Sequence, residues 1–282
     1  MLKSKLNICI FVTGVIILSI LTPFIAVAQG NLLVTPRRVV FDGTRRVLEL
    51  NLANTGVDSS KYNVSLIQYR MNEDGSFTEI TEPDPGQYFA DKNIRFFPRT
   101  VTLGPNEAQV VKMQVTNMER LAPGEYRSHV YFRSVPKLEA LGVEDIKKDT
   151  TSVSVQLTPV FGITIPVIIR VGTPDTKVNL SDIKFEELDD TTKVLEIKFN
   201  RSGNMSVYGD LRVVYVAPNG KETPVGSLNG VAVYTPNKSR TLKIYLSNER
   251  AVNYKTGKLI ISYLSQSDTK PIKFAESELV LR

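Results

Sequence analysis

The stretch that decides the fold is VSVQLTPVFGITIPVII, which runs from Val153 to Ile169. Its odd positions are apolar throughout: Val153, Val155, Leu157, Pro159, Phe161, Ile163, Ile165, Val167 and Ile169. A period of two places alternate side chains on opposite faces, so the stretch predicts one β-strand with one apolar face. Such a strand is far longer than the usual five or six residues. The surplus apolar face must be buried, and a partner chain is one way to bury it.

The first 28 residues predict a signal peptide. Lys3 and Lys5 form a basic start, residues 6–28 are mostly apolar, and Ala26-Val27-Ala28 fits the small-x-small cleavage pattern. We therefore expect the mature chain to begin at Gln29. An uncleaved anchor is the alternative, because the apolar run is long for a signal peptide. No later stretch of the sequence is long and apolar enough to span a bilayer.

Charge and cysteine content exclude several classes of function. The formal net charge of +6 is mild and spread along the chain, so it does not favour nucleic-acid binding. The single cysteine, Cys9, lies inside the predicted signal peptide. The mature chain would then contain no disulfide and no reactive thiolate, and its stability must come from packing.

Short alternating segments separated by turns fill the rest of the sequence. Turn signals such as Asp74-Gly75 and Pro218-Asn219-Gly220 recur between them, and no amphipathic helical pattern of useful length follows the signal peptide. This organisation predicts an all-β chain of two tandem immunoglobulin-like sandwiches. We expect the first domain at 29–172 and the second at 173–282. The charged, non-periodic stretch 137–151 predicts a loop before the long strand.

The sequence contains no convincing catalytic or metal-binding constellation. His129 is the only histidine and sits within a strand pattern, so we expect it to line a sheet face and not to belong to a catalytic triad. With one histidine and no cysteine in the mature chain, a zinc site is not expected. Asp189-Asp190 lies near a predicted turn and is typical of a solvated edge. We therefore expect neither an enzyme nor a cofactor.

Three motifs of the first domain occur in an order that resembles a known family. They are TPRRVVFDG at 35–43, FPRTVTLGPNEAQ at 97–109 and PGEYRS at 123–128, followed by the long alternating strand. In this order the chain resembles the periplasmic pilus-assembly chaperones of the PapD-like superfamily, and is most similar to the branch of the archaic chaperone-usher systems. The resemblance covers roughly residues 32–172, and the second domain matches only as a strand-rich continuation.

The resemblance implies a role for the long strand. Chaperones of this family lend a strand to a pilus or fimbrial subunit that lacks one, and the partners that the resemblance implies are such subunits and an outer-membrane usher in the periplasm. Main-chain hydrogen bonds then supply generic affinity, and apolar side chains fill the open groove of the subunit. On this chain the donor residues would be Val153, Val155, Leu157 and Phe161. Pro159 would cost one backbone donor in that strand.

The resemblance also implies two charged sites. Arg38 takes the position of a base that anchors the C-terminal carboxylate of the subunit. The second base of the family falls near 164–166, where this chain has none, and Arg37 is one candidate to replace it. Glu125 and Arg170 match an ion pair that holds the two domains at a fixed angle. The acidic residue that completes that network aligns near Asn253, so one charge is lost.

A second reading of the sequence belongs to another class of function. A secreted immunoglobulin-like structural or adhesive protein would show the same strand pattern without ever lending a strand. Capture of small subunits in the periplasm would favour the chaperone, and a stable complex with carbohydrate at the cell surface would favour the adhesive protein.

Overall fold

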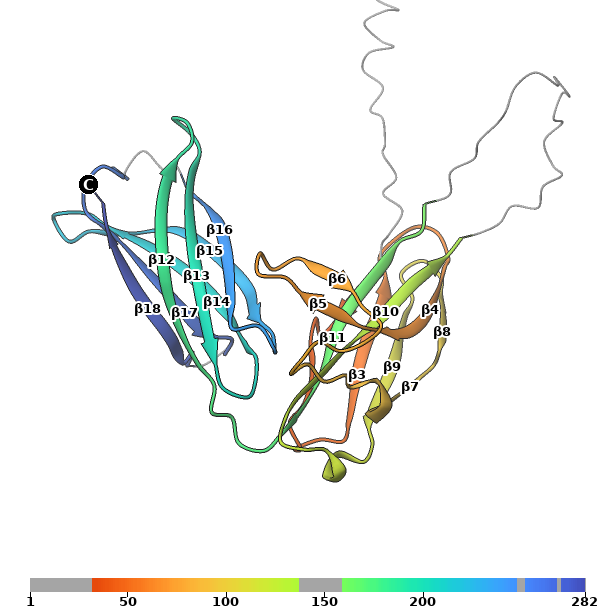
Figure 1. Ribbon diagram of the computed structural model, residues 1–282. Coiled ribbons are helices and arrows are strands. Elements are labelled where there is room, and N and C mark those ends of the chain that lie inside the picture. Colours follow the sequence, from red (N-terminus) through yellow and green to blue (C-terminus); the bar gives the residue numbers. More distant parts are fainter. Residues whose placement is uncertain (1–31, 137–158, 248–251, 268–269, 282) are drawn as a thin grey trace, which may run out of the picture.

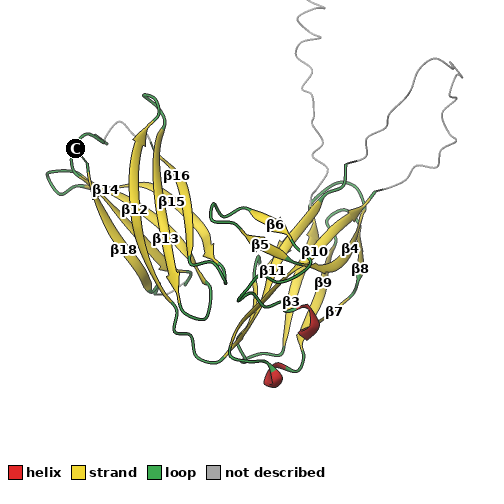
Figure 2. Cartoon of the chain, viewed as in Figure 1, coloured by secondary structure: helices red, strands yellow, loops and turns green. Residues whose placement is uncertain are grey.

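The computed structural model describes residues 32–136, 159–247, 252–267 and 270–281. In these residues almost all regular structure is β-strand, and the strands form two sandwiches arranged as the arms of a V (Figures 1 and 2). The expected all-β class with two tandem immunoglobulin-like sandwiches is confirmed. The signal peptide and the donor residues Val153, Val155 and Leu157 lie outside the described residues.

The first sandwich consists of two sheets. One has the strand order β1-β3-β9-β7, with β1 (Leu32–Thr35), β3 (Val47–Asn54), β9 (Ala108–Val115) and β7 (Ile94–Phe97). The other has the order β2-β11-β10-β4-β8, with β2 (Val39–Phe41), β11 (Gly162–Val171), β10 (Gly124–Val135), β4 (Ser60–Ile67) and β8 (Thr100–Leu103). Short 3-10 turns at Asp91–Asn93 and Met118–Arg120 join strands at the margin.

Alternation along each strand builds the core of this sandwich. Leu50 and Leu52 of β3 face Val130 and Phe132 of β10 across the interior, and all four are fully buried. Strands with one buried and one solvated face stack their apolar faces about 10 Å apart. Burial of this apolar surface is therefore the main force that holds the first sandwich together.

Of the predicted long strand, residues 153–158 lie outside the described residues, and the described strand is shorter than the sequence pattern predicts. β11 starts at Gly162, and residues 159–161 are not part of the ladder. Pro159 has no N–H, and the Phe161 N–H donates to the side-chain Oγ of Ser134 at 2.9 Å. Ile165, Val167 and Ile169 point into the core of the first sandwich. At its C-terminal end, the apolar face of the stretch is therefore buried in the core of the first sandwich and not against a partner chain.

The second sandwich also pairs two sheets. One has the order β12-β13-β16, with β12 (Lys177–Glu187), β13 (Lys193–Ser202) and β16 (Ser239–Leu246). The other has the order β15-β14-β17-β18, with β15 (Glu222–Val233), β14 (Val207–Val216), β17 (Lys258–Ser265) and β18 (Lys273–Val280). Its separate core is centred on Phe199 and Tyr263, whose rings meet edge to face at 5.2 Å.

Two connections join the sandwiches. Residues 172–176 link β11 to β12 at the base of the V (Figure 1). A hairpin of β5 (Tyr69–Met71) and β6 (Phe77–Glu79) extends from the first sandwich toward the second. The hairpin contributes Met71 to a small apolar cluster that contains residues from both domains: Met71, Ile168, Ala232 and Tyr234. No helix in the described residues could cross a membrane.

Candidate functional site

One edge of the second sheet of the first sandwich is only partly covered. β11 pairs with β10 along its whole length, but on its other side it pairs with β2 only at Val167, Ile168 and Ile169. The outer side of residues 162–166 therefore has no strand partner among the described residues. Unpaired backbone groups on a sheet edge are a template for pairing with another chain. This segment is called the open edge below.

The direction of each backbone group on β11 follows from one hydrogen bond. The N–H of Ser134 donates to the carbonyl of Phe161 at 2.8 Å, so Phe161 directs its backbone groups toward β10. In an antiparallel pair this direction alternates residue by residue. Gly162, Thr164 and Pro166 therefore direct their backbone groups toward the open edge. Among these, only Pro166 lacks an N–H.

This alternation revises the role expected of the prolines. Pro159 was expected to cost the donor strand one backbone donor. By the alternation observed at Phe161, an extended chain at Pro159 would direct the missing N–H toward β10 instead. Pro166 is the residue that removes a donor from the open edge. A proline is tolerated at this position because its backbone nitrogen faces away from β10, so the pairing of β11 with β10 loses no hydrogen bond.

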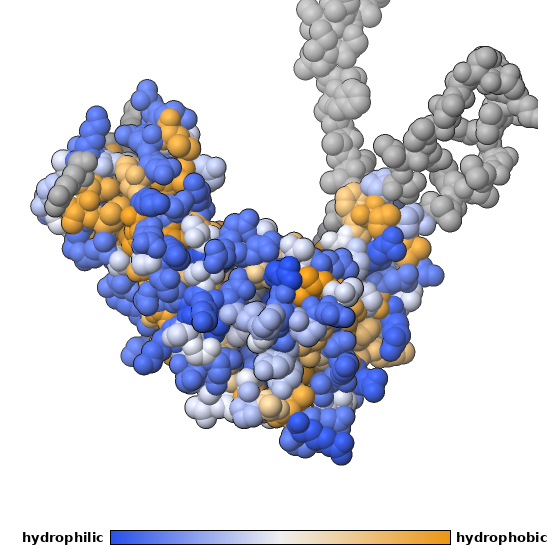
Figure 3. All heavy atoms as spheres, in the orientation of Figure 1, coloured by the Kyte–Doolittle hydropathy of each residue, from blue (hydrophilic) through white to orange (hydrophobic). Residues whose placement is uncertain are grey.

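Apolar side chains are exposed at the upper end of the open edge. Val160 and Phe161 are 42% and 43% exposed. Apolar surface in Figure 3 gathers at the top of the first sandwich, beside the point where the grey residues leave it. Phe161 has the same parity as Ile163 and Ile165, which pack on the first core. The apolar face of β11 therefore extends beyond the core of the first sandwich to Phe161, whose side chain is exposed.

A buried carboxylate joins the two domains. The Arg170 Nε lies 3.0 Å from Glu125 Oε2, and the Glu125 side chain is fully buried. The same oxygen accepts hydrogen bonds from the backbone N–H of Ser206 at 3.0 Å and from its hydroxyl at 2.7 Å. Arg170 Nη2 also donates to the Ser206 carbonyl at 2.8 Å. A carboxylate can be buried at this depth because several donors replace its water.

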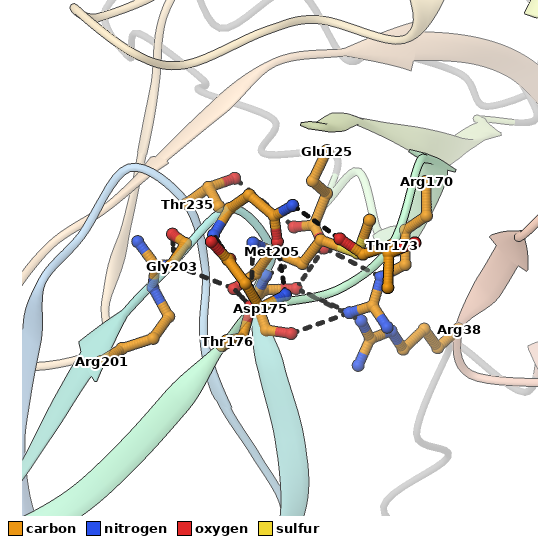
Figure 4. A network of polar contacts seen from close by, with 12 residues as sticks. Arg38, Glu125, Arg170, Thr173, Asp175, Thr176, Arg201, Gly203, Met205 and Thr235 are labelled. Atoms are coloured by element: carbon orange, nitrogen blue, oxygen red, sulfur yellow. Dashed lines mark hydrogen bonds and ion pairs between the residues drawn. The ribbon is translucent and has the colours of Figure 1, made fainter. Parts of the chain in front are cut away.

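The loop that presents Ser206 is held in place by its own polar contacts (Figure 4). Arg201 of β13 donates to the carbonyls of Gly203 and Met205, both at 2.8 Å. The linker residue Thr176 donates from its hydroxyl to Met205 at 2.9 Å and accepts from the Met205 N–H at 3.0 Å. Ser206 therefore reaches Glu125 from a braced loop, and the linker is part of the brace.

Asn253 does not complete this network. Its side-chain oxygen accepts from the backbone N–H of Lys255 at 3.0 Å, within an exposed turn of the second domain. The remaining contact of Glu125 comes from the hydroxyl of Thr235 at 3.4 Å. Neutral hydroxyls and a backbone N–H thus take the place that the alignment gave to Asn253.

Arg38 lies beside this network, at the start of β2. Its Nη2 donates weakly to the Ser206 hydroxyl at 3.4 Å, and its guanidinium stands 4.4 Å from the ring centre of Tyr208. Burial lowers the pKa of Arg38, yet an arginine keeps its charge at neutral pH. Its Nε has no partner among the described protein atoms. Arg37 is exposed, and it lies in the bend that connects β1 to β2.

A second arginine at this site was missed by the sequence analysis. Arg127 lies on the same face of β10 as Glu125 and is only 3% exposed. Its guanidinium stands 4.3 Å from the ring centre of Tyr234, and Arg38 stands 5.8 Å from the same ring. Its Nε and Nη1 have no partner among the described protein atoms. The two-residue spacing from Glu125 was the signal that could have revealed it.

The two guanidinium groups form an electropositive site with free donors. Burial lowers the pKa of Arg127; Tyr234 and the carboxylate of Glu125 raise it, and the neighbouring charge of Arg38 lowers it. Buried donors without acceptors cost free energy. A carboxylate would supply acceptors to both groups. We name Arg38, Arg127 and Tyr234 the arginine site.

His129 is buried two residues further along the same face of β10. Its ring meets Tyr69 at 5.0 Å and Phe77 at 5.7 Å, both edge to face. Burial, with a smaller contribution from Arg127, lowers the pKa of His129 to about 3. The ring is therefore neutral at physiological pH, and it lines the sheet face. The described residues contain no group of three side chains suited to a metal ion.

Comparison with solved structures finds fimbrial chaperones over most of the chain. The YadV chaperone aligns with 12% identity and a TM-score of 0.45, covering 89% of this chain and all of its own. The CupB2 chaperone of Pseudomonas aeruginosa aligns with 11% identity and a TM-score of 0.42, covering 89% and 100%.

A complex gives a similar result. The CsuC–CsuE chaperone–tip subunit complex from the archaic chaperone-usher Csu pili of Acinetobacter baumannii matches at 11% identity and a TM-score of 0.42, covering 87% of this chain and 99% of that one. No protein-family model matches the sequence, and no curated protein matches it.

Proposed function

We propose that this protein is a periplasmic chaperone that binds incomplete pilus or fimbrial subunits by strand pairing at the open edge. The observation that carries the proposal is the junction on β11 where the open edge meets β2. Both lie on the same side of β11, and β2 runs parallel to it. A guest strand that ran in the same direction as β2 would end where β2 begins.

Arg38 stands at that junction. It directly precedes Val39, the first residue of β2 to pair with β11, opposite Val167. The last residue of a parallel guest strand would therefore meet the arginine site, and its terminal carboxylate would find the free donors of Arg38 and Arg127. Strand pairing supplies affinity for any extended chain, while the carboxylate sets the register.

The exposed apolar residues support the same proposal. An incomplete subunit exposes an apolar groove, and Phe161 continues the apolar face of β11 into solvent. Val153, Val155 and Leu157 would extend this face and fill the groove. Burial of each side chain in the groove would stabilise the complex by about 25 cal/mol per Å² of apolar area, before the costs of association are subtracted. Delivery of the subunit to an outer-membrane usher, and a role in fimbrium biogenesis, belong to the same proposal.

Periplasmic expression with mass spectrometry of co-purified small proteins tests the proposal. We expect the wild-type chain to retain pilus-like subunits and the Phe161→Asp/Leu157→Asp variant to lose them while it remains folded. Val57→Asp is the matched control, because Val57 is 79% exposed in the turn between β3 and β4, which is not part of the open edge. Subunit retention by the double variant would refute strand donation. A carbohydrate complex without subunits would support the adhesive alternative.

A further inference from the structure

The β5–β6 hairpin belongs to the first sandwich but makes polar contacts with the second. The N–H of Thr241 donates to the carbonyl of Glu73 at 2.7 Å, and the Ser239 hydroxyl donates to the Glu73 carboxylate at 3.1 Å. The side-chain amide of Asn237 donates to the carbonyl of Met71 at 2.8 Å. All three donors lie at or just before the start of β16. The hairpin tip thus caps one end of the free edge of β16.

The hairpin also makes apolar contacts across the same boundary. Met71 is 3% exposed and packs in the cluster that contains Ala232 and Tyr234 of the second domain. The Phe77 ring lies 6.2 Å from the Tyr234 ring. Tyr234 is therefore held by the hairpin on one side and faces Arg38 and Arg127 within cation–π range.

The turn of the hairpin is adapted to this contact. Gly75 has a φ of +86°, and a Cβ at this position would overlap the guanidinium of Arg240 from β16. Arg240 is itself fixed by donating to the Ala232 carbonyl at 2.7 Å. A glycine satisfies both the left-handed backbone and the close approach of the neighbouring domain.

We propose that the β5–β6 hairpin is an interdomain clasp, and that Met71 and Glu73 are positioning residues that hold Tyr234 against the arginine site. The proposal rests on the proposed function, because it assigns these residues a task in carboxylate binding. The Glu125 network joins the domains at one place and the hairpin joins them at a second. Two separated contacts restrict rotation that a single contact would allow.

The first test measures the motion of the domains. Spin labels at Thr102→Cys and Lys255→Cys, in a chain with Cys9→Ser, report the distance between exposed sites of the two sandwiches. Thr241→Pro removes the N–H that bonds Glu73, and replacing residues 72–76 by Asn-Gly removes the tip. We expect both changes to broaden the distance distribution. Tyr245→Pro is the matched control, because Tyr245 has the same outward parity on β16 but is 73% exposed.

The second test measures carboxylate binding. The probe is an N-acetylated hexapeptide of alternating Thr and Val, compared as free acid and as C-terminal amide by calorimetry. The wild-type chain should prefer the acid about tenfold or more, the range of one charge-assisted bond. In the clasp variants this preference should fall toward unity, while amide binding stays within about twofold, because strand pairing does not use Tyr234.

The two tests separate the clasp from the proposed function. An unchanged distance distribution in both clasp variants would overturn the clasp. A preserved preference for the acid in those variants would overturn the positioning role. If the wild-type chain itself shows no preference, the carboxylate anchor of the proposed function fails. The positioning role then fails with it, and the distance measurement alone decides whether the hairpin is a clasp.

Discussion

Glu125 of the first sandwich and Ser206 of the second are joined by two hydrogen bonds to one carboxylate oxygen, although 81 residues separate them in the sequence. Arg170 bonds to both residues, so the three groups form a closed unit across the domain boundary. Such a unit couples the two domains, because the loss of any one member would leave a buried charge without one of its partners.

Loss of the Ser206 hydroxyl should weaken the coupling between the domains. We expect Ser206→Ala to lower the free energy of unfolding by about 1.5–3 kcal/mol, the range for a hydrogen bond to a charged group. Chemical denaturation with a probe in each domain measures this change. Ser262→Ala is the control, because its hydroxyl bonds a carboxylate at a comparable 2.8 Å on the exposed surface. An equal loss in both variants would contradict a special role for the interdomain bond.

Removal of Arg170 should cost more than removal of Ser206. Arg170→Met leaves the Glu125 charge buried without its cationic partner, which typically destabilises by about 3–5 kcal/mol. The Arg170 side chain is 27% exposed, so the lower part of this range is expected. The double variant Arg170→Met/Glu125→Gln should recover part of the loss. Thermal unfolding of the three variants measures this, and the absence of any recovery would contradict the proposed cause.

The two neighbouring arginines should differ in their effect on binding. Arg38→Ala should weaken capture of a subunit with a free C-terminus by about ten- to a hundredfold, because one charge-assisted contact is lost. Arg37→Ala should change it little, because Arg37 is exposed and lies outside the arginine site. Surface plasmon resonance on a captured subunit compares the variants. Equal, negligible losses would mean that the client is not held by its terminal carboxylate.

The stability of the first domain should fall at acid pH because of His129. Its pKa is about 3 in the folded chain and near 6.5 in the unfolded chain, so the unfolded state binds the proton first as pH falls. Stability contributed by the neutral ring is complete above pH 6.5 and is lost as pH falls from 6.5 toward 3, with a slope of up to about 1.4 kcal/mol per pH unit.

The variant His129→Phe isolates this effect, since the chain has no other histidine. Phenylalanine keeps an aromatic ring between Tyr69 and Phe77 but cannot be protonated. We expect the unfolding free energy of the wild type to fall relative to that of the variant as pH is lowered from 6.5 to 4. Parallel stability curves over this range would show that the ring does not titrate on unfolding.

Part of the fold could be read directly from local pattern. The alternation over 153–169 predicted one strand with an apolar face, and at its described end the structure places Ile165, Val167 and Ile169 in the core. Where β11 begins was not predictable in the same way. Its start at Gly162 depends on where β10 ends and on the side chain of Ser134, which binds the Phe161 N–H.

The sequence by itself determined which side chains share a face, because a two-residue period is a property of the extended backbone and needs no partner. The same period puts Glu125, Arg127 and His129 on one face of β10, although Arg127 was not singled out in the sequence analysis. Only the tertiary structure decided that this face meets the second domain, that Ser206 rather than Asn253 completes the Glu125 network, and that Tyr234 stands beside two arginines. These contacts join residues on separate sandwiches, and their geometry depends on the relative orientation of the two domains. Local periodicity contains no information on that orientation.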